Sequence, residues 1–215
     1  MNQERIKKIS FVVFSAGIVV AVLLSVLVYY HPVLNFDVLV SQKLQGSNDV
    51  NVFLQKILIA TSWLGQTMIA MAVLLFFSLI FWLYKYYWEN LFCLLAGLSA
   101  VINAILKIAI HRPRPPEGIV HIIDHQISPS YPSGHVVFFT VFYGFVLTAM
   151  FFTPRIPKLF RILAGAASAA LIVLISFSRI YLGAHWATDV IGGYALGIAL
   201  LSILLYFYLK EYVKK

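Results

Sequence analysis

The sequence predicts an all-α integral membrane protein: a bundle of six transmembrane helices, with one short interfacial helix in the first outer loop. Composition is the first support, because 61% of the 215 residues are hydrophobic and 11% are charged, whereas about a quarter of the residues of a soluble domain carry charge. Long apolar runs are the second support, since roughly 20 apolar residues cross a bilayer. We expect one membrane-embedded domain, residues 1–215. The predicted spans are residues 11–30, 57–84, 90–110, 135–153, 159–178 and 187–209.

The N-terminal apolar run is interpreted as a retained first span rather than a secretion signal. It is longer than the ~7–15-residue core of a signal peptide, and no small-x-small cleavage site follows it. The second span is long, so it is expected to begin in the membrane interface or to tilt.

A short helix is predicted in the first outer loop, residues 31–56, where apolar residues recur at helical spacing with polar residues between them. Asp49 is placed to cap the helix that leads into the second span. The second outer loop, residues 111–134, is rich in Pro, His and Arg and is expected to be irregular. The apolar residues of the short helix are Phe36, Leu39, Val40 and Leu44.

The distribution of basic residues predicts the orientation, because cytoplasmic loops carry an excess of Lys and Arg. Ten of the 16 Lys and Arg fall on one side of a six-span bundle, and three of the other six belong to the motifs described below. We therefore expect a multi-pass protein of the cell membrane with both termini in the cytoplasm. The ten residues are Arg5, Lys7, Lys8, Lys85, Arg155, Lys158, Arg161, Lys210, Lys214 and Lys215.

Three short stretches concentrate the ionisable residues: 107–115 (KIAIHRPRP), 132–135 (PSGH) and 178–189 (SRIYLGAHWATD). Ionisable residues are expensive inside an apolar chain and mark a functional site by default. The first stretch ends the third span, the second begins the fourth, and the third begins the sixth after two further crossings. All three therefore meet at the extracytoplasmic face, a result that the spacing of the motifs did not require.

His185 and Asp189 are four residues apart and so share one helix face. A carboxylate near an imidazole N–H selects the tautomer and stabilises the imidazolium, which leaves the other ring nitrogen free to attack phosphorus. The alternative is a structural His–Asp pair that bridges two spans. Arg179 lies at the same helix mouth, six residues before His185, and favours the catalytic interpretation.

Lys107, Arg114 and Arg179 are candidate ligands for an anion. Guanidinium groups match phosphate oxygens in two-pronged hydrogen bonds, and Lys supplies a point charge. The alternative is that these side chains extend to lipid headgroups from helix ends. This alternative suits Lys107 alone better than it suits all three residues.

The stretch 132–135 opens the fourth span, where free N–H groups and the helix dipole favour phosphate. Ser133 adds a hydroxyl donor, and Gly134 lets the backbone approach the phosphate closely. His135 is placed to act as a general acid on the leaving oxygen. An ordinary helix cap remains the alternative for this tetrapeptide taken alone.

Together the motifs read K-x6-RP, PSGH and SR-x5-H-x3-D, which resembles without departure the signature of the type 2 phosphatidic acid phosphatase superfamily, a group that includes vanadium haloperoxidases. Length and span layout are similar to those of the small bacterial members, such as phosphatidylglycerophosphatase B and undecaprenyl-pyrophosphate phosphatases. The resemblance implies that His185 is the nucleophile and forms a phosphohistidine, with Asp189 orienting it. It implies that His135 protonates the leaving group and then activates water. The implied phosphate ligands are Lys107, Arg114, Ser133, Gly134 and Arg179.

The resemblance also implies a metal-independent hydrolase that needs no cofactor. The sequence offers no carboxylate cluster for Mg²⁺, and Cys93, the single cysteine, permits neither an intrachain disulfide nor a cysteine-based metal cluster. The expected partner is a membrane lipid with a phosphate headgroup, and nothing indicates a nucleic acid. Candidate substrates are phosphatidylglycerophosphate, undecaprenyl diphosphate and phosphatidic acid, and the oligomeric state is left open.

Three other functions were weighed. A lipid phosphotransferase would use the same phosphohistidine with an alcohol as acceptor, and the sequence leaves this choice open. A non-catalytic phospholipid transporter or receptor would have no need of His135 or of the His185–Asp189 pair. A vanadate-dependent haloperoxidase would share the motifs, but such enzymes are soluble.

Four histidines are not assigned to the site. His31 is interpreted as interfacial, and His121 and His125 as solvated loop residues. His111 and Arg112 lie inside the first motif at unspecified positions. Whether they touch substrate, for example the second phosphate of a diphosphate, is left open.

Overall fold

The computed structural model describes residues 3–46 and 52–212, which form helices, turns and loops with one isolated bridge and no strand. Within them, five helical segments are long and apolar enough to cross a membrane, or six if the bent pair α3–α4 counts as one span. The predicted all-α membrane bundle is confirmed. The helices are α1 (Gln3–Tyr30), α2 (Asn35–Gln45), α3 (Val52–Leu64), α4 (Thr67–Leu83), α5 (Tyr87–Ala96), α6 (Ser99–Ile110), α7 (Gly134–Phe138), the π-helical η1 (Phe139–Tyr143), α8 (Gly144–Phe152), α9 (Lys158–Tyr181) and α10 (Ala187–Tyr212).

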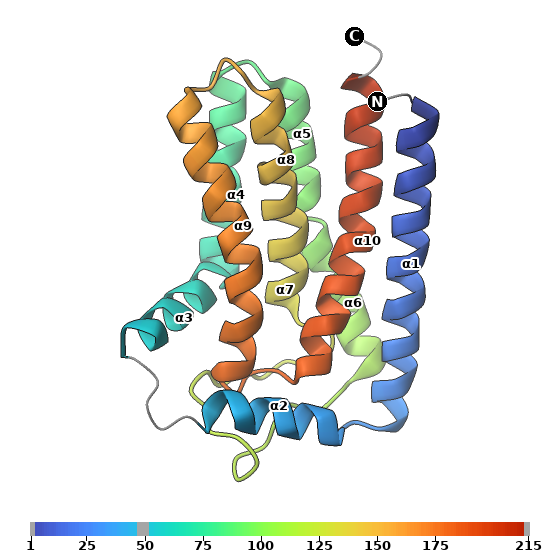
Figure 1. Cartoon of the computed structure of the whole chain (residues 1–215), viewed down its shortest axis with the longest axis vertical. Coiled ribbons are helices and arrows are strands. Elements are labelled where there is room, and N and C mark those ends of the chain that lie inside the picture. Colours follow the sequence, from blue (N-terminus) through green and yellow to red (C-terminus); the bar gives the residue numbers. More distant parts are fainter. Residues whose placement is uncertain (1–2, 47–51, 213–215) are drawn as a thin grey trace.

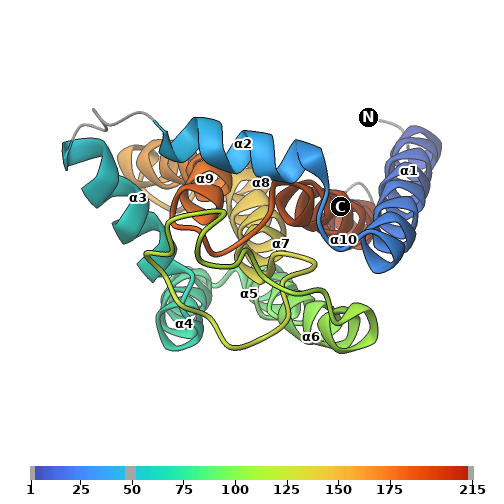
Figure 2. The same ribbon diagram turned by 90° about the horizontal axis from the view of Figure 1, so that it is seen from below.

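The bundle has two chemically different ends (Figure 1). Helix α1 begins and α10 ends at one end, whereas α2 and the loops that carry the three motifs lie at the other. Seen from that second end, α2 crosses over α9 and α10 while the loops gather toward α4 and α6 (Figure 2). The number of membrane crossings between the motifs predicted that all three lie at the same end of the bundle, and the arrangement of the helices agrees.

The continuous segment α7–η1–α8 is the central element of the bundle. In the most apolar 18-residue window of this segment 72% of residues are buried, against 17% in α1 and 17% in α9. Phe139, Phe142 and Phe145 are fully buried along it and contact other aromatic rings. Because the PSGH motif begins this central segment, the motif lies inside the protein instead of at the lipid boundary.

The second predicted span is broken. Helices α3 and α4 meet at an angle of 75°, and the break occurs at Gly65 and Gln66. A Cβ atom on Gly65 would come within 2.1 Å of Cδ2 of His135. The sequence predicted a span that begins in the interface or tilts, and the structure instead shows a sharp bend, which brings the end of α3 next to a motif histidine.

The predicted short helix in the first outer loop is present as α2, but its polar side chains do not all face outward. Phe36 and Leu39 are 50% and 66% exposed, whereas Asp37 is completely buried. Val40 and Leu44 pack against the core. Helix α2 therefore directs the carboxylate of Asp37 into the protein interior. Asp49, the predicted cap of the next helix, lies outside the described residues.

Candidate active site

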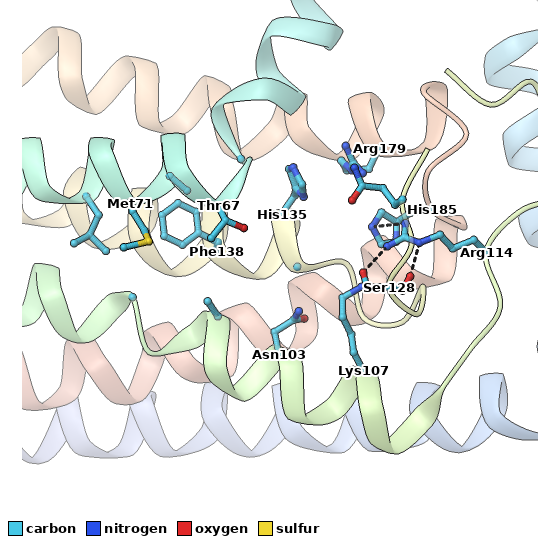
Figure 3. A pocket seen from close by; sticks show the side chains of 17 residues that line it. Thr67, Met71, Asn103, Lys107, Arg114, Ser128, His135, Phe138, Arg179 and His185 are labelled. Atoms are coloured by element: carbon cyan, nitrogen blue, oxygen red, sulfur yellow. Dashed lines mark hydrogen bonds between the residues drawn. The ribbon is translucent and has the colours of Figure 1, made fainter. Parts of the chain in front are cut away.

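The three motifs converge on one cavity at the α2 end of the bundle. Lys107 projects from α6, Arg114 from the following loop, His135 from α7, Arg179 from the end of α9 and His185 from the α9–α10 turn, and all five line the cavity. Figure 3 shows these side chains directed toward one another. The structure brings together the charged residues that the sequence predicted for the site.

The α9–α10 turn depends on Gly183. This residue has φ +68°, and a Cβ atom there would lie 2.5 Å from the carbonyl oxygen of His121. Glycine adopts this left-handed conformation without steric cost. The turn can therefore pack tightly against the outer loop and carry His185 over the cavity.

His185 is held with one ring nitrogen toward Asp189 and the other toward Arg114. Its Nδ1 lies 3.4 Å from Oδ2 of Asp189, and its Nε2 lies 3.3 Å from NH1 of Arg114. Since a carboxylate only accepts hydrogen bonds, Nδ1 is the protonated nitrogen and Nε2 carries the lone pair. Burial lowers the pKa of His185 well below its usual value, and the nearby charges of Arg114 and Arg179 lower it further. The ring is therefore neutral and its Nε2 can act as a nucleophile.

Asp189 is a fully buried carboxylate whose oxygens both have donors. Oδ2 accepts hydrogen bonds from the Trp186 N–H at 2.9 Å and from the Ser130 hydroxyl. Oδ1 accepts from Arg112 at 2.5 Å. This set of donors fixes the position of the carboxylate beside the imidazole.

Lys107 and Arg114 are held mainly by backbone oxygens. Lys107 Nζ donates to the carbonyl of Pro129. Arg114 donates to the carbonyl oxygen of Ser128 at 2.6 Å and to that of Ala184. Burial lowers the pKa of Arg114 to about 10, with a further contribution from Arg179, so the guanidinium remains charged at neutral pH. Neutral partners orient both cations without cancelling their charge.

Arg179 is fully buried, yet two of its three guanidinium nitrogens have no partner among the described residues. NH1 donates to the Ser62 hydroxyl and to Oδ2 of Asp124 at 2.7 Å, whereas Nε and NH2 are buried and unbonded. Burial alone would raise the pKa of Asp124, but Arg179 and its hydrogen bonds lower it overall. Unsatisfied buried donors in a cavity are suited to the oxygens of an anion.

Gly134 and His135 of the PSGH motif line the same cavity, whereas Ser133 is not among its lining residues. The Ser133 hydroxyl is buried and has no partner in the described part of the chain, while the Ser133 N–H already donates to the Asp189 carbonyl at 3.1 Å. A Cβ atom on Gly134 would lie 2.9 Å from Nδ2 of Asn103. Glycine at this position therefore lets α7 begin beside the Asn103 side chain, whose amide would have to move to admit a Cβ atom.

His135 lies at the α3–α4 break. Its Nε2 is 3.1 Å from the carbonyl oxygen of Ser62. A carbonyl oxygen only accepts, so this nitrogen carries a proton and the other ring nitrogen is the one available for proton transfer.

The cavity continues from the charged residues into an apolar region between α4, α6 and α7. Thr67, Met71 and Phe138 lie in this part, away from the charged residues (Figure 3). Asn103 lies between the two parts, on the α6 face that also carries Lys107, and its Oδ1 has no partner among the described residues. One end of the cavity thus suits an anion and the other end suits a hydrocarbon chain.

Several residues of this site were missed by sequence reasoning. Asn103 could have been found, because it is a polar residue one helical turn before Lys107 in an apolar span. Asp124, Ser128 and Ser130 lie in the irregular loop, where the sequence has no periodicity to place them. Arg112, left open above, does not line the cavity and is fully buried against Asp189.

The remaining histidines do not line the cavity. His111 is exposed and ends α6 in the left-handed conformation, with φ 50°. His121 contributes its backbone to contacts with Gln45. Within residues 3–46 and 52–212, no group of three or more His, Cys, Asp or Glu is placed to hold a metal ion.

Comparison with known sequences gives consistent matches. A family model described as the PAP2 superfamily matches residues 88–212. The chain is 30% identical over 168 residues to phosphatidylglycerophosphatase B of Bacillus subtilis, which covers 76% of this chain and 77% of that protein. It is 38% identical over 76 residues to an undecaprenyl-diphosphatase of Sulfolobus acidocaldarius, which covers 34% of this chain and 32% of that protein.

Two solved structures share the fold. A transmembrane PAP2-type phosphatidylglycerolphosphate phosphatase from Bacillus subtilis has a TM-score of 0.76 and 24% identity, covering 90% of this chain and 94% of that one. Aquifex aeolicus LpxE has a TM-score of 0.61 and 21% identity, covering 80% of this chain and 96% of that one. At these identities the likeness concerns the fold alone.

Proposed function

This chain belongs to the PAP2 superfamily of lipid phosphatases, and we propose that it releases the terminal phosphate of a lipid phosphate or diphosphate through a phosphohistidine at His185. One observation carries the proposal. The unprotonated Nε2 of a buried imidazole lies 3.3 Å from Arg114, while Nδ1 of the same ring faces Asp189. A nucleophile, its orienting carboxylate and an oxyanion ligand are thereby in place before substrate binds.

In the first step the Nε2 lone pair attacks phosphorus and the bond from phosphorus to the lipid oxygen breaks. His135, protonated on both ring nitrogens when substrate binds, gives its Nδ1 proton to that oxygen, so the lipid leaves as a neutral alcohol or as a monophosphate. Arg114, Arg179 and Lys107 hold the non-bridging oxygens, whose charge is spread in the transition state. Asp189 stabilises the positive charge that develops on His185.

In the second step water attacks the phosphohistidine and gives a proton to His135. The nitrogen–phosphorus bond breaks, inorganic phosphate leaves, and His185 regains its lone pair. General acid–base catalysis of this kind contributes about 10²–10⁴-fold. The two histidines then have returned to their starting protonation states.

The two-part cavity supports a lipid substrate. The headgroup phosphate would lie among the cations, and the acyl or prenyl chain would follow the region that contains Met71 and Phe138. The panel to test is phosphatidylglycerophosphate, undecaprenyl diphosphate and phosphatidic acid, of which the first two match the names of relatives in Bacillus subtilis and Sulfolobus acidocaldarius.

We propose that the reaction is metal-independent, because three side-chain cations already surround the place for the phosphoryl group. Detergent-purified protein should release phosphate from at least one member of the panel in EDTA, with His185→Ala as the inactive control. Vanadate should inhibit, since its trigonal-bipyramidal form imitates pentacoordinate phosphorus. Activity that is lost in EDTA and restored by Mg²⁺ would contradict the proposed chemistry.

We also propose that the site faces the outside of the cell membrane, as the basic residues of the opposite end indicate. In a Cys93→Ser background, Glu117→Cys should react with a membrane-impermeant thiol reagent in intact cells. Pro157→Cys, at the opposite end, should react only after permeabilisation. Both positions are exposed in the folded protein, so the reverse pattern would overturn the orientation.

A further inference from the structure

Arg112 forms a buried ionic cluster that lies outside the cavity. Its NH1 donates to Oδ1 of Asp189 at 2.5 Å, and its NH2 donates to Oδ2 of Asp37 at 2.6 Å. All three side chains have zero exposure. The cluster joins residues from α2, from the loop after α6 and from α10, which are far apart in the sequence.

Asp37 also binds the start of α10. Its Oδ1 accepts the backbone N–H of Thr188 at 2.8 Å, and its Oδ2 accepts the Thr188 hydroxyl at 2.8 Å. Thr188 immediately precedes Asp189 and accepts a hydrogen bond from Arg112 NH1 at 2.8 Å. A single carboxylate of α2 therefore holds both the arginine and the backbone that carries Asp189.

The cluster is poorly explained as a device for stability. Removing charges from water costs several kcal/mol per ion, and an apolar replacement of similar volume is often no less stable. The net charge of the cluster instead suits a role beside His185. Two carboxylates and one guanidinium sum to −1, and this excess negative charge lies on the Asp189 side of His185, away from the cations that face the cavity.

We propose that Arg112 and Asp37 are positioning residues for catalysis. By occupying Oδ1 of Asp189, Arg112 leaves Oδ2 to face the Nδ1–H of His185, and Asp37 holds Arg112 in place. Arg112 does not bind the substrate phosphate, in contrast to Arg114 two residues later. Helix α2 then takes part in catalysis through Asp37, besides covering the end of the bundle.

The test rests on the proposed phosphatase function and uses steady-state kinetics of the full-length enzyme. Arg112→Gln removes the charge of the arginine. Asp37→Asn keeps an acceptor for the Thr188 N–H but removes the carboxylate charge. Each should lower kcat by about tenfold or more, equivalent to about 1.4 kcal/mol of transition-state stabilisation, with KM unchanged. Lys43→Gln, an exposed change on the same helix, is the matched control and should leave kcat unchanged.

A double-mutant cycle separates this role from a merely structural one. In an Asp189→Asn background, neither Arg112→Gln nor Asp37→Asn should reduce kcat further, because the carboxylate they position is gone. A nitrophenyl ester keeps the residual rate measurable. Losses that multiply in this background, or a rise in KM with kcat unchanged, would overturn the proposal. If Arg112→Gln does not fold, the same kcat and KM comparison is made with Asp37→Asn alone and in the Asp189→Asn background, and its outcome decides the proposal.

The two proposals fail in distinguishable ways. A wild-type enzyme that releases phosphate from no lipid of the panel refutes the proposed function, and the positioning role falls with it. An active wild-type enzyme whose kcat is insensitive to Arg112→Gln and to Asp37→Asn refutes the positioning role alone.

Discussion

Gly65→Ala should damage proton transfer without removing any catalytic group. A Cβ atom at this position would lie 2.1 Å from Cδ2 and 2.9 Å from Nε2 of His135, whereas ordinary van der Waals contact begins at 3.4 Å. The ring must therefore move by about 1 Å or more, and it loses its hydrogen bond to the Ser62 carbonyl. A misplacement of about 1 Å can cost about 10²-fold in rate.

The assay compares two leaving groups. Hydrolysis of a lipid phosphate, whose alkoxide needs a proton, should fall by about 10²-fold in Gly65→Ala. Release of nitrophenol from a nitrophenyl phosphate in the first turnover should fall much less, because this leaving group needs little protonation. Gly165→Ala is the matched control, since its Cβ would meet only Leu147 at an ordinary 3.5 Å. Equal losses on both substrates in a variant with normal thermal unfolding would refute the reasoning.

Three further outcomes are expected. His185→Ala should abolish turnover and any acid-labile phosphoenzyme trapped by rapid quench into alkali, and a retained phosphoenzyme would exclude this residue as the nucleophile. His135→Ala should slow release of the lipid leaving group by about 10²–10⁴-fold. First-turnover release of nitrophenol should fall much less, because only the first step depends on the leaving group, so the two rates are compared in a single turnover. Burial and the charge of Arg114 hold the pKa of His185 well below its usual value, so phosphoenzyme formation should persist in mildly acidic solution. Arg114→Gln removes a positive neighbour and raises that pKa, so the acid limb of the single-turnover pH profile should move to higher pH; a shift to lower pH would contradict this electrostatic assignment.

Features governed by local composition were predictable from the sequence. The apolar runs placed the spans, since hydropathy over about 20 residues is a local property. The helical spacing around Leu39 and Val40 predicted α2. The convergence of the motifs at one end required only the number of membrane crossings between them. Six of the predicted site residues do line one cavity: Lys107, Arg114, Gly134, His135, Arg179 and His185.

Features governed by contacts distant in the sequence were not predictable. The bend at Gly65 depends on contact with His135, which belongs to another span. Asp37 looked like part of the polar face of an amphipathic helix, because its partners Arg112 and Thr188 lie 75 and 151 residues away. Asp124 lies in a loop without periodicity, so nothing local indicated its ion pair with Arg179.

The charges around His185 are divided between its two sides. On the cavity side, Lys107 and Arg114 donate to neutral carbonyl oxygens. Arg179 pairs with Asp124 through NH1, but its Nε and NH2 have no partner within the described ranges. Their positive charge is thus available to a phosphoryl group and needs no reorganisation when substrate arrives. On the other side, the Asp189 cluster carries the negative charge that suits an imidazolium. When the imidazole of His185 attacks phosphorus, negative charge develops on the phosphoryl oxygens and positive charge develops on the ring. The cations of the cavity stabilise the first charge, and the Asp189 cluster stabilises the second.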